Sequence, residues 1–268
     1  MRENFVRYEQ AGRVVTLTFM RPDTRNAIAE HEDCRDLVEA LERANADPGV
    51  SALILTGSGS AFSAGGNLKA MRDRDGIGPQ ASPVGTRANY KRGIQKIPQT
   101  FMALEITTIA AINGHAIGLG LDLACMCDLR VAADTAKFAS SFVKIGIVPG
   151  DGGAWILPRV IGYAKAAELM LTGDTYSAAE AKEMGLVGAI VPPEQVMAEA
   201  TKLAERVAAN PPHAVRLAKR LLREAQTARL PEILELSSAF QALAHETRDH
   251  REALDAFFDK RPAVFTGE

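Results

Sequence analysis

The sequence has little of what marks a membrane, secreted or nucleic-acid-binding protein. No apolar run is long enough to span a bilayer, and no N-terminal stretch passes from charged to apolar residues as a secretory signal does. The net charge of the 268-residue chain is only −2, and its basic residues form no stripe of the kind that binds nucleic acid. No internal repeat of fixed period is present. We therefore expect a cytoplasmic protein that binds neither a membrane nor nucleic acid.

Cysteine is scarce as well. Cys34, Cys125 and Cys127 are odd in number and lack the spacing of a disulfide framework. A single residue separates Cys125 from Cys127, whereas two residues separate the cysteines of common zinc and redox pairs. We expect three buried free thiols in a reducing compartment, and no metal site.

The remaining composition, 47% hydrophobic and 24% charged, is typical of a soluble globular enzyme. Apolar and β-branched runs predict strands over residues 5–8, 14–19, 52–55, 109–112 and 186–191. Helical spacing of apolar residues predicts helices over residues 30–46, 90–104, 164–171, 178–184, 194–209, 212–226, 231–246 and 247–258. The polar segment 72–90 is predicted to be a mobile loop over a pocket. These elements predict an α/β core of strand–strand–helix units over residues 1–194, followed by a helical region over residues 195–268.

Three glycine-rich turns stand directly before predicted helices. The turn at residues 118–120 follows a buried strand and leads into a helix that carries Asp122 in its first turn. The turn at 149–153 contains Asp151, and a third turn at 64–66 precedes a short helix. Helix starts leave backbone N–H groups unpaired and favour negative charge. The sequence therefore predicts backbone anion sites, two of them beside an aspartate. A dinucleotide-binding fingerprint is disfavoured, because its later glycine and its acidic residue are missing.

Several of these segments resemble the motifs of one family. Residues 61–68 (AFSAGGNL), 110–114 (AAING) and 146–150 (GIVPG), together with Asp122 and Cys127-Asp128, resemble the enoyl-CoA hydratase/isomerase (crotonase) superfamily. The resemblance covers nearly the whole chain. It implies a crotonase-like spiral of ββα units that assembles as a homotrimer, often stacked as a hexamer. It also implies a coenzyme A thioester as substrate and no permanently bound cofactor.

The resemblance further implies that two backbone N–H groups hold the thioester oxygen as negative charge builds up on it. By position these donors are Gly66 and Leu119, the second of which is usually glycine in the hydratases. A leucine can still supply its backbone N–H, although its side chain would narrow the pocket. Such preorganised donors typically contribute about 3–4 kcal/mol each to an enolate-like transition state.

Coenzyme A contacts are also implied only by the resemblance. Arg25 and Ala27 would lie near the phosphates and adenine, and Ala64 and Leu68 beside the adenine pocket. Phe257 and Lys260 fall where the C-terminal helix of the family reaches a coenzyme A, often that of the neighbouring subunit. For Arg25 and Lys260 the alternative is a solvated surface charge.

The acidic residues decide which reaction is expected. The hydratases that this chain resembles use two glutamates; Asp122 stands at the first position, but the second falls on Phe142. Asp151 is the obvious substitute, with a helix cap as its alternative role, and Asp122 could instead complement the helix dipole. His115 could be a polar pocket residue or a structural histidine, and Lys144 could pair with an acid.

The resemblance thus favours an enoyl-CoA hydratase that stabilises an enolate in an oxyanion hole. The alternatives are an enoyl-CoA isomerase that uses a single aspartate, a crotonase-type hydrolase, and a non-catalytic coenzyme A- or RNA-binding member, which the missing glutamate at Phe142 motivates. The C-terminal helices are expected to mediate self-association, because they carry more apolar surface than a small core can absorb. The residues concerned are Ile233, Leu236, Phe240, Leu243, Phe257 and Phe258.

Overall fold

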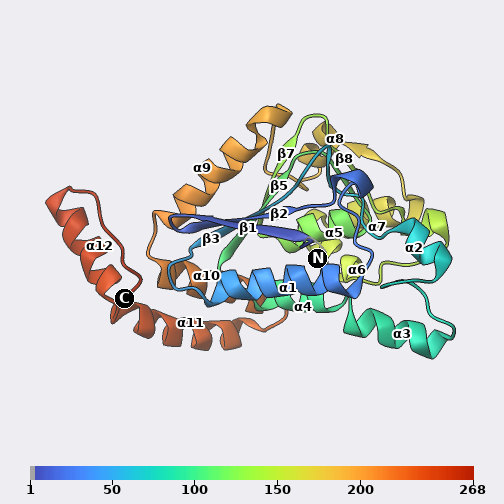
Figure 1. Cartoon of the computed structure of the whole chain (residues 1–268). Helices are drawn as coiled ribbons and strands as arrows, with labels where there is room; N and C mark the ends of the chain where they lie inside the picture. The colour runs from blue at the N-terminus through green and yellow to red at the C-terminus, as the bar shows by residue number, and fades with distance from the viewer. Residues whose placement is uncertain (1–3) are drawn as a thin grey trace.

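A six-stranded sheet runs through the centre of the computed structural model, which describes residues 4–268 (Figure 1). Its strand order is β1-β2-β3-β5-β7-β10, and only the β1–β2 pair is antiparallel. The strands are β1 (Val6–Ala11), β2 (Val14–Phe19), β3 (Ala52–Gly57), β5 (Thr107–Ile112), β7 (Leu129–Ala133) and β10 (Ala189–Val191). Every residue of β3 and β5 is buried, which explains their continuous apolar runs. The predicted strand at 186–191 is shorter than expected, since pairing begins only at Ala189.

A second, four-stranded sheet completes a spiral. It has the order β4-β6-β8-β9 and is formed by β4 (Ala61–Ser63), β6 (His115–Ile117), β8 (Lys137–Ala139) and β9 (Tyr176–Ser177). Each of the consecutive pairs β3–β4, β5–β6 and β7–β8 gives its first strand to the large sheet and its second strand to the small one. Helices α2 (Leu68–Asp73) and α5 (Leu119–Met126) follow the first two pairs, and η2 (Ser141–Ile145) with α6 (Gly153–Ile161) follows the third. The predicted α/β fold, a spiral of ββα units, is confirmed.

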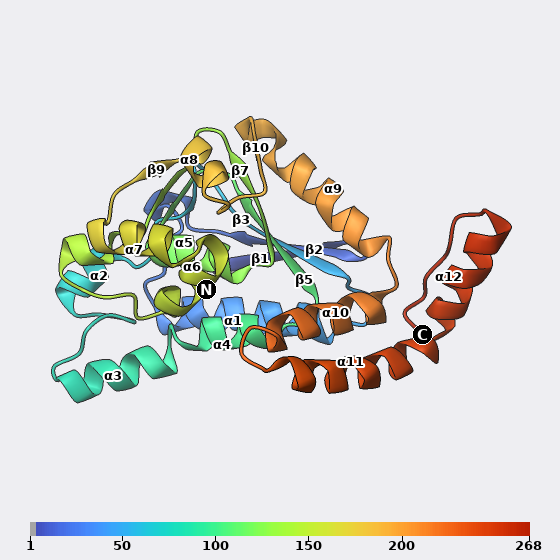
Figure 2. The ribbon, with the colours of Figure 1, turned by 180° about the vertical axis from the view of Figure 1, so that it is seen from behind.

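Helices cover both faces of the large sheet (Figures 1 and 2). On one side, α1 (His31–Ala46) packs against β1 and against α4 (Lys96–Ala103). On the other, α9 (Val196–Ala208) crosses β3, β5 and β7 and buries its apolar stripe there. The short elements η1 (Pro22–Thr24), α7 (Tyr163–Thr172), α8 (Ala178–Glu183) and η3 (Pro193–Gln195) connect the layers.

The segment between α2 and β5 differs from the prediction. Residues 72–90 are not one long loop, because α3 (Pro83–Arg92) occupies the second half of the segment. Ser82 caps this helix by accepting a hydrogen bond from the Gly85 N–H at 3.1 Å, and Pro83 stands at its first position, where proline is favoured. The helix predicted over 90–104 is interrupted at Gly93, so that α3 and α4 are separate. Ile97 and Phe101 of α4 are fully buried and attach this helix to the core.

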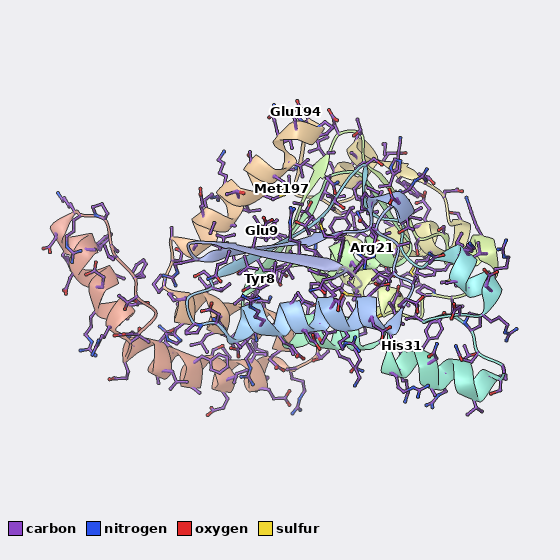
Figure 3. All side chains as sticks on the ribbon, in the orientation of Figure 1. Tyr8, Glu9, Arg21, His31, Glu194 and Met197 are labelled. Atoms are coloured by element: carbon purple, nitrogen blue, oxygen red, sulfur yellow. The ribbon has the colours of Figure 1, made fainter. Side chains whose placement is uncertain are left out.

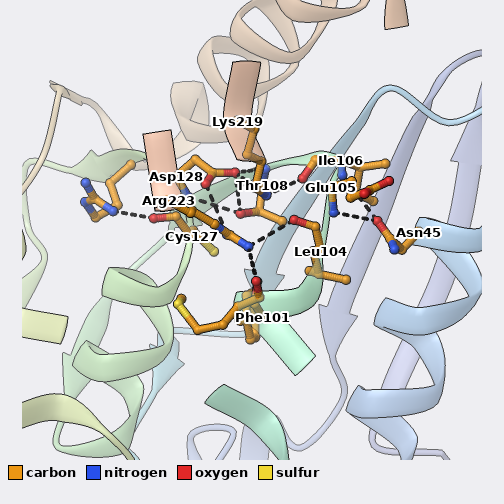
Figure 4. Close-up of polar contacts among 12 residues, drawn as sticks. Asn45, Phe101, Leu104, Glu105, Ile106, Thr108, Cys127, Asp128, Lys219 and Arg223 are labelled. Carbon is orange, nitrogen blue, oxygen red and sulfur yellow. Dashed lines mark hydrogen bonds and ion pairs between the residues drawn. The ribbon is translucent and has the colours of Figure 1, made fainter. Parts of the chain in front are cut away.

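Helix α10 (Pro212–Glu224) is held against the core by the buried Lys219 and the half-buried Arg223. Figure 4 shows Asp128 accepting hydrogen bonds from the Thr108 N–H at 2.7 Å and from Lys219 Nζ at 2.7 Å. Arg223 Nη2 lies 3.3 Å from Asp128, and its Nη1 donates to the Leu104 carbonyl at 2.9 Å. Burial lowers the pKa of Lys219 to about 8, although the Asp128 charge opposes the shift. A buried charge without such a partner would be strongly destabilising, so this pair fixes the position of α10.

The last two helices, α11 (Leu230–His245) and α12 (Arg248–Asp259), extend away from the sheets (Figures 1 and 2). No residue of α11 is buried, and Phe257 and Phe258 of α12 are 76% and 75% exposed. The chain end folds back onto α12, where Asp249 accepts hydrogen bonds from the Thr266 and Gly267 N–H groups at 2.8 and 2.9 Å. A large apolar surface is therefore left uncovered in the single chain.

Candidate active site

Asp122 is a buried carboxyl group without an ordinary partner. It lies in the first turn of α5, a helix whose residues are all buried, and is only 1% exposed. Within residues 4–268, no donor forms a hydrogen bond with either of its carboxylate oxygens. Burial raises the pKa of Asp122 well above its usual range, and the nearby charge of Asp151 raises it further. A buried polar group that stays unpaired is costly, so it is a candidate for a functional role.

Asp151 approaches Asp122 from the turn before α6. It is 3% exposed, and its Oδ1 accepts a long hydrogen bond, 3.4 Å, from the Gly153 N–H. The cap position of α6 is Gly152, with φ +99°, so Asp151 precedes the cap. Burial raises the pKa of Asp151 too, against the lowering effect of Asp122 and the backbone N–H groups. Two carboxyl groups buried side by side are stable when they share one proton, and they then titrate as a pair.

Gly153 makes this approach sterically feasible. A Cβ added at this position would lie 2.2 Å from Oδ2 and 2.5 Å from Oδ1 of Asp122. The carboxylate of Asp122 is therefore packed directly on the first residue of α6, and only a glycine fits there. The need for glycine at position 153 was not predicted, although two consecutive glycines after Asp151 in the sequence were a signal for it.

The two expected oxyanion donors lie at one site. A Cβ on Gly65, whose φ is +85°, would stand 2.5 Å from the Ile117 carbonyl oxygen and 3.0 Å from the Leu119 nitrogen, so these two chain segments are in direct contact. Leu119 is the first residue of α5, and its N–H has no partner within the helix. No acceptor in residues 4–268 is bonded to the N–H of Gly66 or of Leu119. Both groups are free to bind an oxyanion.

These donors and Asp151 share one narrow cavity of about 30 Å³. Its lining residues are Gly66, Met71, Ile77, Tyr90, Ile94, Leu119, Phe142, Ile147, Val148, Gly150 and Asp151. Asp151 is the only carboxylate among them, and Asp122 stands behind it. Phe142, at the position of the missing glutamate, lines the cavity and lies within 3.6 Å of where a Cβ on Gly118 would be. The narrow cavity therefore has the apolar ring of Phe142 where a second carboxylate would be expected.

Tyr90 was also missed by the sequence analysis. It lies on α3, at the boundary between the predicted loop (72–90) and the predicted helix (90–104). Its ring packs so closely on Gly150 that a Cβ there would be 2.5 Å from Tyr90 Cε1. Burial and the charge of Asp151 raise the pKa of Tyr90. The tyrosine therefore forms the wall of the cavity next to the acidic pair.

The segments expected to contact coenzyme A lie side by side at the other end of the cavity. The Arg25 backbone carbonyl accepts a hydrogen bond from the Ala64 N–H at 2.8 Å, and the Ile28 N–H donates to the Gly65 carbonyl at 2.8 Å. Arg25 and Leu68 are exposed, whereas Ala27 is buried. Phe257 and Lys260, by contrast, lie at the end of α12, far from α2 (Figure 1). Within one chain the structure does not bring these two residues to the site.

The remaining candidates lie outside the cavity. His115 is exposed on β6, and Lys144 Nζ forms an ion pair with Asp174 at 3.0 Å instead of with either buried aspartate. The three cysteines are free and buried, as predicted, and burial raises the pKa of Cys125 and of Cys127 to about 12. Across the described part of the chain, no group of three or more His, Cys, Asp or Glu side chains could hold a metal ion. No helix in residues 4–268 is long and apolar enough to cross a membrane.

Comparison with known proteins agrees with this geometry. The sequence model of the enoyl-CoA hydratase/isomerase family matches residues 9–268. A probable enoyl-CoA hydratase of Mycobacterium tuberculosis is 36% identical over 258 residues, which cover 96% of each chain. The 1,2-epoxyphenylacetyl-CoA isomerase of Escherichia coli is 36% identical over 255 residues, 95% of each chain. The crystal structure of an enoyl-CoA hydratase from Bacillus anthracis superimposes with a TM-score of 0.91 at 32% identity, over 99% of this chain and 100% of that one. The chain belongs to the enoyl-CoA hydratase/isomerase family.

Proposed function

We propose that this protein hydrates a 2-enoyl-CoA thioester, with the buried Asp122–Asp151 pair as its acid and base. The observation that carries the proposal is the position of Asp151, which lines one cavity with two unpaired backbone N–H groups and has the buried Asp122 behind it. Hydration needs an ionised carboxylate and a protonated carboxyl group at the same pH. A carboxyl pair that holds one proton supplies both forms.

In the proposed reaction, Asp122 and Asp151 together hold the same number of protons before and after each turnover. The thioester oxygen accepts hydrogen bonds from the N–H groups of Gly66 and Leu119. The pair takes one proton from water as the water oxygen bonds to the β-carbon, and the electrons of the double bond move to the thioester oxygen as an enolate. The pair then returns a proton to the α-carbon. One proton remains on the pair after the cycle, as before it. Asp151 faces the cavity, so it contacts the reacting atoms, while Asp122 behind it shares the proton.

A second candidate, isomerisation of a 3-enoyl-CoA to a 2-enoyl-CoA, is favoured by Phe142. The apolar wall at this position leaves Asp151 as the only cavity-facing carboxylate. One carboxylate suffices to remove a proton from the α-carbon and deliver it to the γ-carbon. The same two oxyanion donors would stabilise the enolate in this reaction.

One experiment tests both candidates. The purified protein is incubated with 2-enoyl- and 3-enoyl-CoA thioesters, and the products are separated by chromatography and identified by mass spectrometry. Hydration adds the mass of one water to the substrate, whereas isomerisation changes only the retention time. A variant with both Asp122→Asn and Asp151→Asn is the control. Turnover of every substrate at the rate of this control would refute the proposal, whichever reaction is considered.

We also propose how the rest of the chain serves this site. Arg25, Ala27, Ala64 and Leu68 would bind coenzyme A, because they lie together beside Gly66. The uncovered apolar faces of α11 and α12 support assembly as a homotrimer or a hexamer through residues 195–268. In such an assembly Phe257 and Lys260, which do not reach the site of their own chain, would contact the coenzyme A of a neighbouring subunit.

A further inference from the structure

A second, wider cavity opens beyond the acidic pair. It has a volume of about 680 Å³ and shares Tyr90, Ile147, Val148 and Gly150 with the narrow cavity. The two cavities are therefore adjacent, and Tyr90 and the turn at 147–150 form the wall that they share. Helix α3 and the residues just before it form the outer wall.

The position of the wide cavity indicates which part of a substrate would reach it. If the function proposed above holds, coenzyme A enters beside Ala64 and Leu68, and its thioester oxygen lies at Gly66 and Leu119. The acyl chain then runs past Asp151 toward Tyr90. The wide cavity lies beyond Tyr90, so it receives the end of the acyl chain that is farthest from the sulfur.

The wall of this cavity carries positive charge and no negative charge. Arg74, Arg87 and Lys91 line it, and no carboxylate does. Residues 76–104 contain four basic side chains, at positions 87, 91, 92 and 96, and not one Asp or Glu. Neither Arg87 nor Lys91 forms an ion pair with another residue of the described chain, 4–268. They stand four residues apart on α3, a spacing at which like charges repel, so an anion between them would relieve that repulsion.

The other polar groups of this wall are already engaged. Ser82 caps α3, and Thr86 Oγ1 accepts a hydrogen bond from the Gln80 N–H at 2.8 Å. Gln95 Nε2 donates to the Gly150 carbonyl at 2.9 Å, and Arg74 Nη2 donates to the Gln80 carbonyl at 2.5 Å. Arg87 and Lys91 are therefore the two cations of this wall whose side chains have no hydrogen-bond or ion-pair partner in residues 4–268, while Arg74 retains further N–H donors beside them.

Helix α3 is held in place by its opposite face. The buried Asn89 donates to the carbonyl oxygens of Gly76 and Gly78 at 3.0 and 2.9 Å. Its Oδ1 lies 2.7 Å from Nε2 of His31, which is labelled in Figure 3 at the end of α1 facing α3. This network fixes the rotation of α3 about its axis. Arg87 and Lys91 are thereby presented to the cavity by a fixed helix and not by a loose loop.

We propose that the wide cavity binds a carboxylate at the distal end of the acyl chain, so that the preferred substrates are CoA thioesters of dicarboxylic acids. The Arg87 guanidinium can pair with both oxygens of a carboxylate, and Lys91 adds a point charge beside it. The apolar walls of the narrow cavity, among them Ile147 and Val148, enclose the methylene carbons between the two polar ends. A chain that ends in a methyl group would leave both cations without a partner.

The test compares two 2-enoyl-CoA thioesters of equal chain length, one ending in a methyl group and one in a carboxylate. The values of kcat and KM are measured for the wild type, for Arg87→Gln with Lys91→Gln, and for the control Arg92→Gln. Arg92 lies on the same helix but does not line this cavity. We expect the double variant to lose about tenfold or more in kcat/KM on the carboxylate substrate, mainly through KM. Turnover of the methyl substrate, and both activities of the Arg92→Gln control, should not change.

Two outcomes would overturn the proposal. An equal loss on both substrates would assign Arg87 and Lys91 to the coenzyme A phosphates, and no loss on either would make them solvated charges only. If the wild type turns over neither substrate, the proposed reaction fails. The affinities of the two thioesters, measured by calorimetry, then test the cavity by itself. Tighter binding of the carboxylate thioester that is lost in the double variant would support the carboxylate site, and equal affinities would refute it.

Discussion

Replacing Gly153 with alanine tests whether the two buried aspartates depend on close packing of α5 against α6. The new Cβ would lie 2.2 Å from Oδ2 of Asp122, whereas nonbonded carbon atoms prefer roughly 3.5–4.0 Å. Either the carboxylate or the start of α6 must then move by about 1 Å. Overpacking of this kind typically costs about 1–3 kcal/mol. For a chain of this size, that cost lowers Tm by roughly 2–12 °C.

The same substitution in an Asp122→Ala background is the matched control. Once the carboxylate is gone, the methyl group at 153 has space, and alanine is intrinsically favoured over glycine in a helix by up to about 1 kcal/mol. We expect Gly153→Ala to be neutral or slightly stabilising there, as measured by thermal unfolding followed by circular dichroism. The coupling between the two sites should then exceed about 1 kcal/mol. Equal losses of Tm in both backgrounds would refute the packing argument, and unchanged turnover in Gly153→Ala would refute its link to catalysis.

Three further predictions concern pH, the anchor of α10 and assembly. The pKa of Asp122 in the folded protein is raised above 3.8, its ordinary value in the unfolded chain. The protonated Asp122 therefore stabilises the fold fully below pH 3.8, and this stabilisation is lost as the pH rises through the folded pKa. The free energy of unfolding, measured in urea from pH 4 to 8, should therefore fall more in the wild type than in Asp122→Asn, which retains only the raised pKa of Asp151; parallel curves would contradict this. Lys219→Met should lower the free energy of unfolding by about 1.5–3 kcal/mol, since Asp128 loses a charged donor, and an unchanged urea midpoint would argue against the anchor. Light scattering at micromolar concentration should show a trimer or hexamer, because Leu243 and Phe257 are exposed in the single chain; a monomer would exclude this.

Features that depend on neighbouring residues could be predicted from the sequence. The strand, glycine turn and helix around residues 107–126 are local, so the position of Asp122 in the first turn of α5 follows from the order of residues alone. The burial of the three cysteines was also predictable, because Cys125 and Cys127 lie in an apolar run and no spacing suggested another role. The alternation of strands with helices was sufficient to predict the α/β class.

Features that depend on packing between distant segments were not predictable. The meeting of Asp122 with Asp151 requires the start of α6 to pack on α5, and the need for glycine at 153 appears only in that packed state. Helix α3 was interpreted as a loop because it buries a single residue, Asn89, and therefore lacks an apolar stripe. Ser82 followed by Pro83 is a typical helix start and was the one clear sign of α3. The polar, glycine- and proline-containing composition of the segment nevertheless favoured a loop. With α3 missing, Tyr90 could not be placed beside Asp151.

The turnover of Asp151→Asn measures most directly whether the cavity-facing carboxylate of Asp151 moves protons. An asparagine keeps the shape of the side chain and can still accept the hydrogen bond from the Gly153 N–H, so the fold should remain intact. We expect kcat on the best enoyl-CoA substrate to fall by about 10²-fold or more, the usual scale for a general acid–base group. Wild-type turnover in a folded Asp151→Asn variant would show that this carboxylate does not carry the proton.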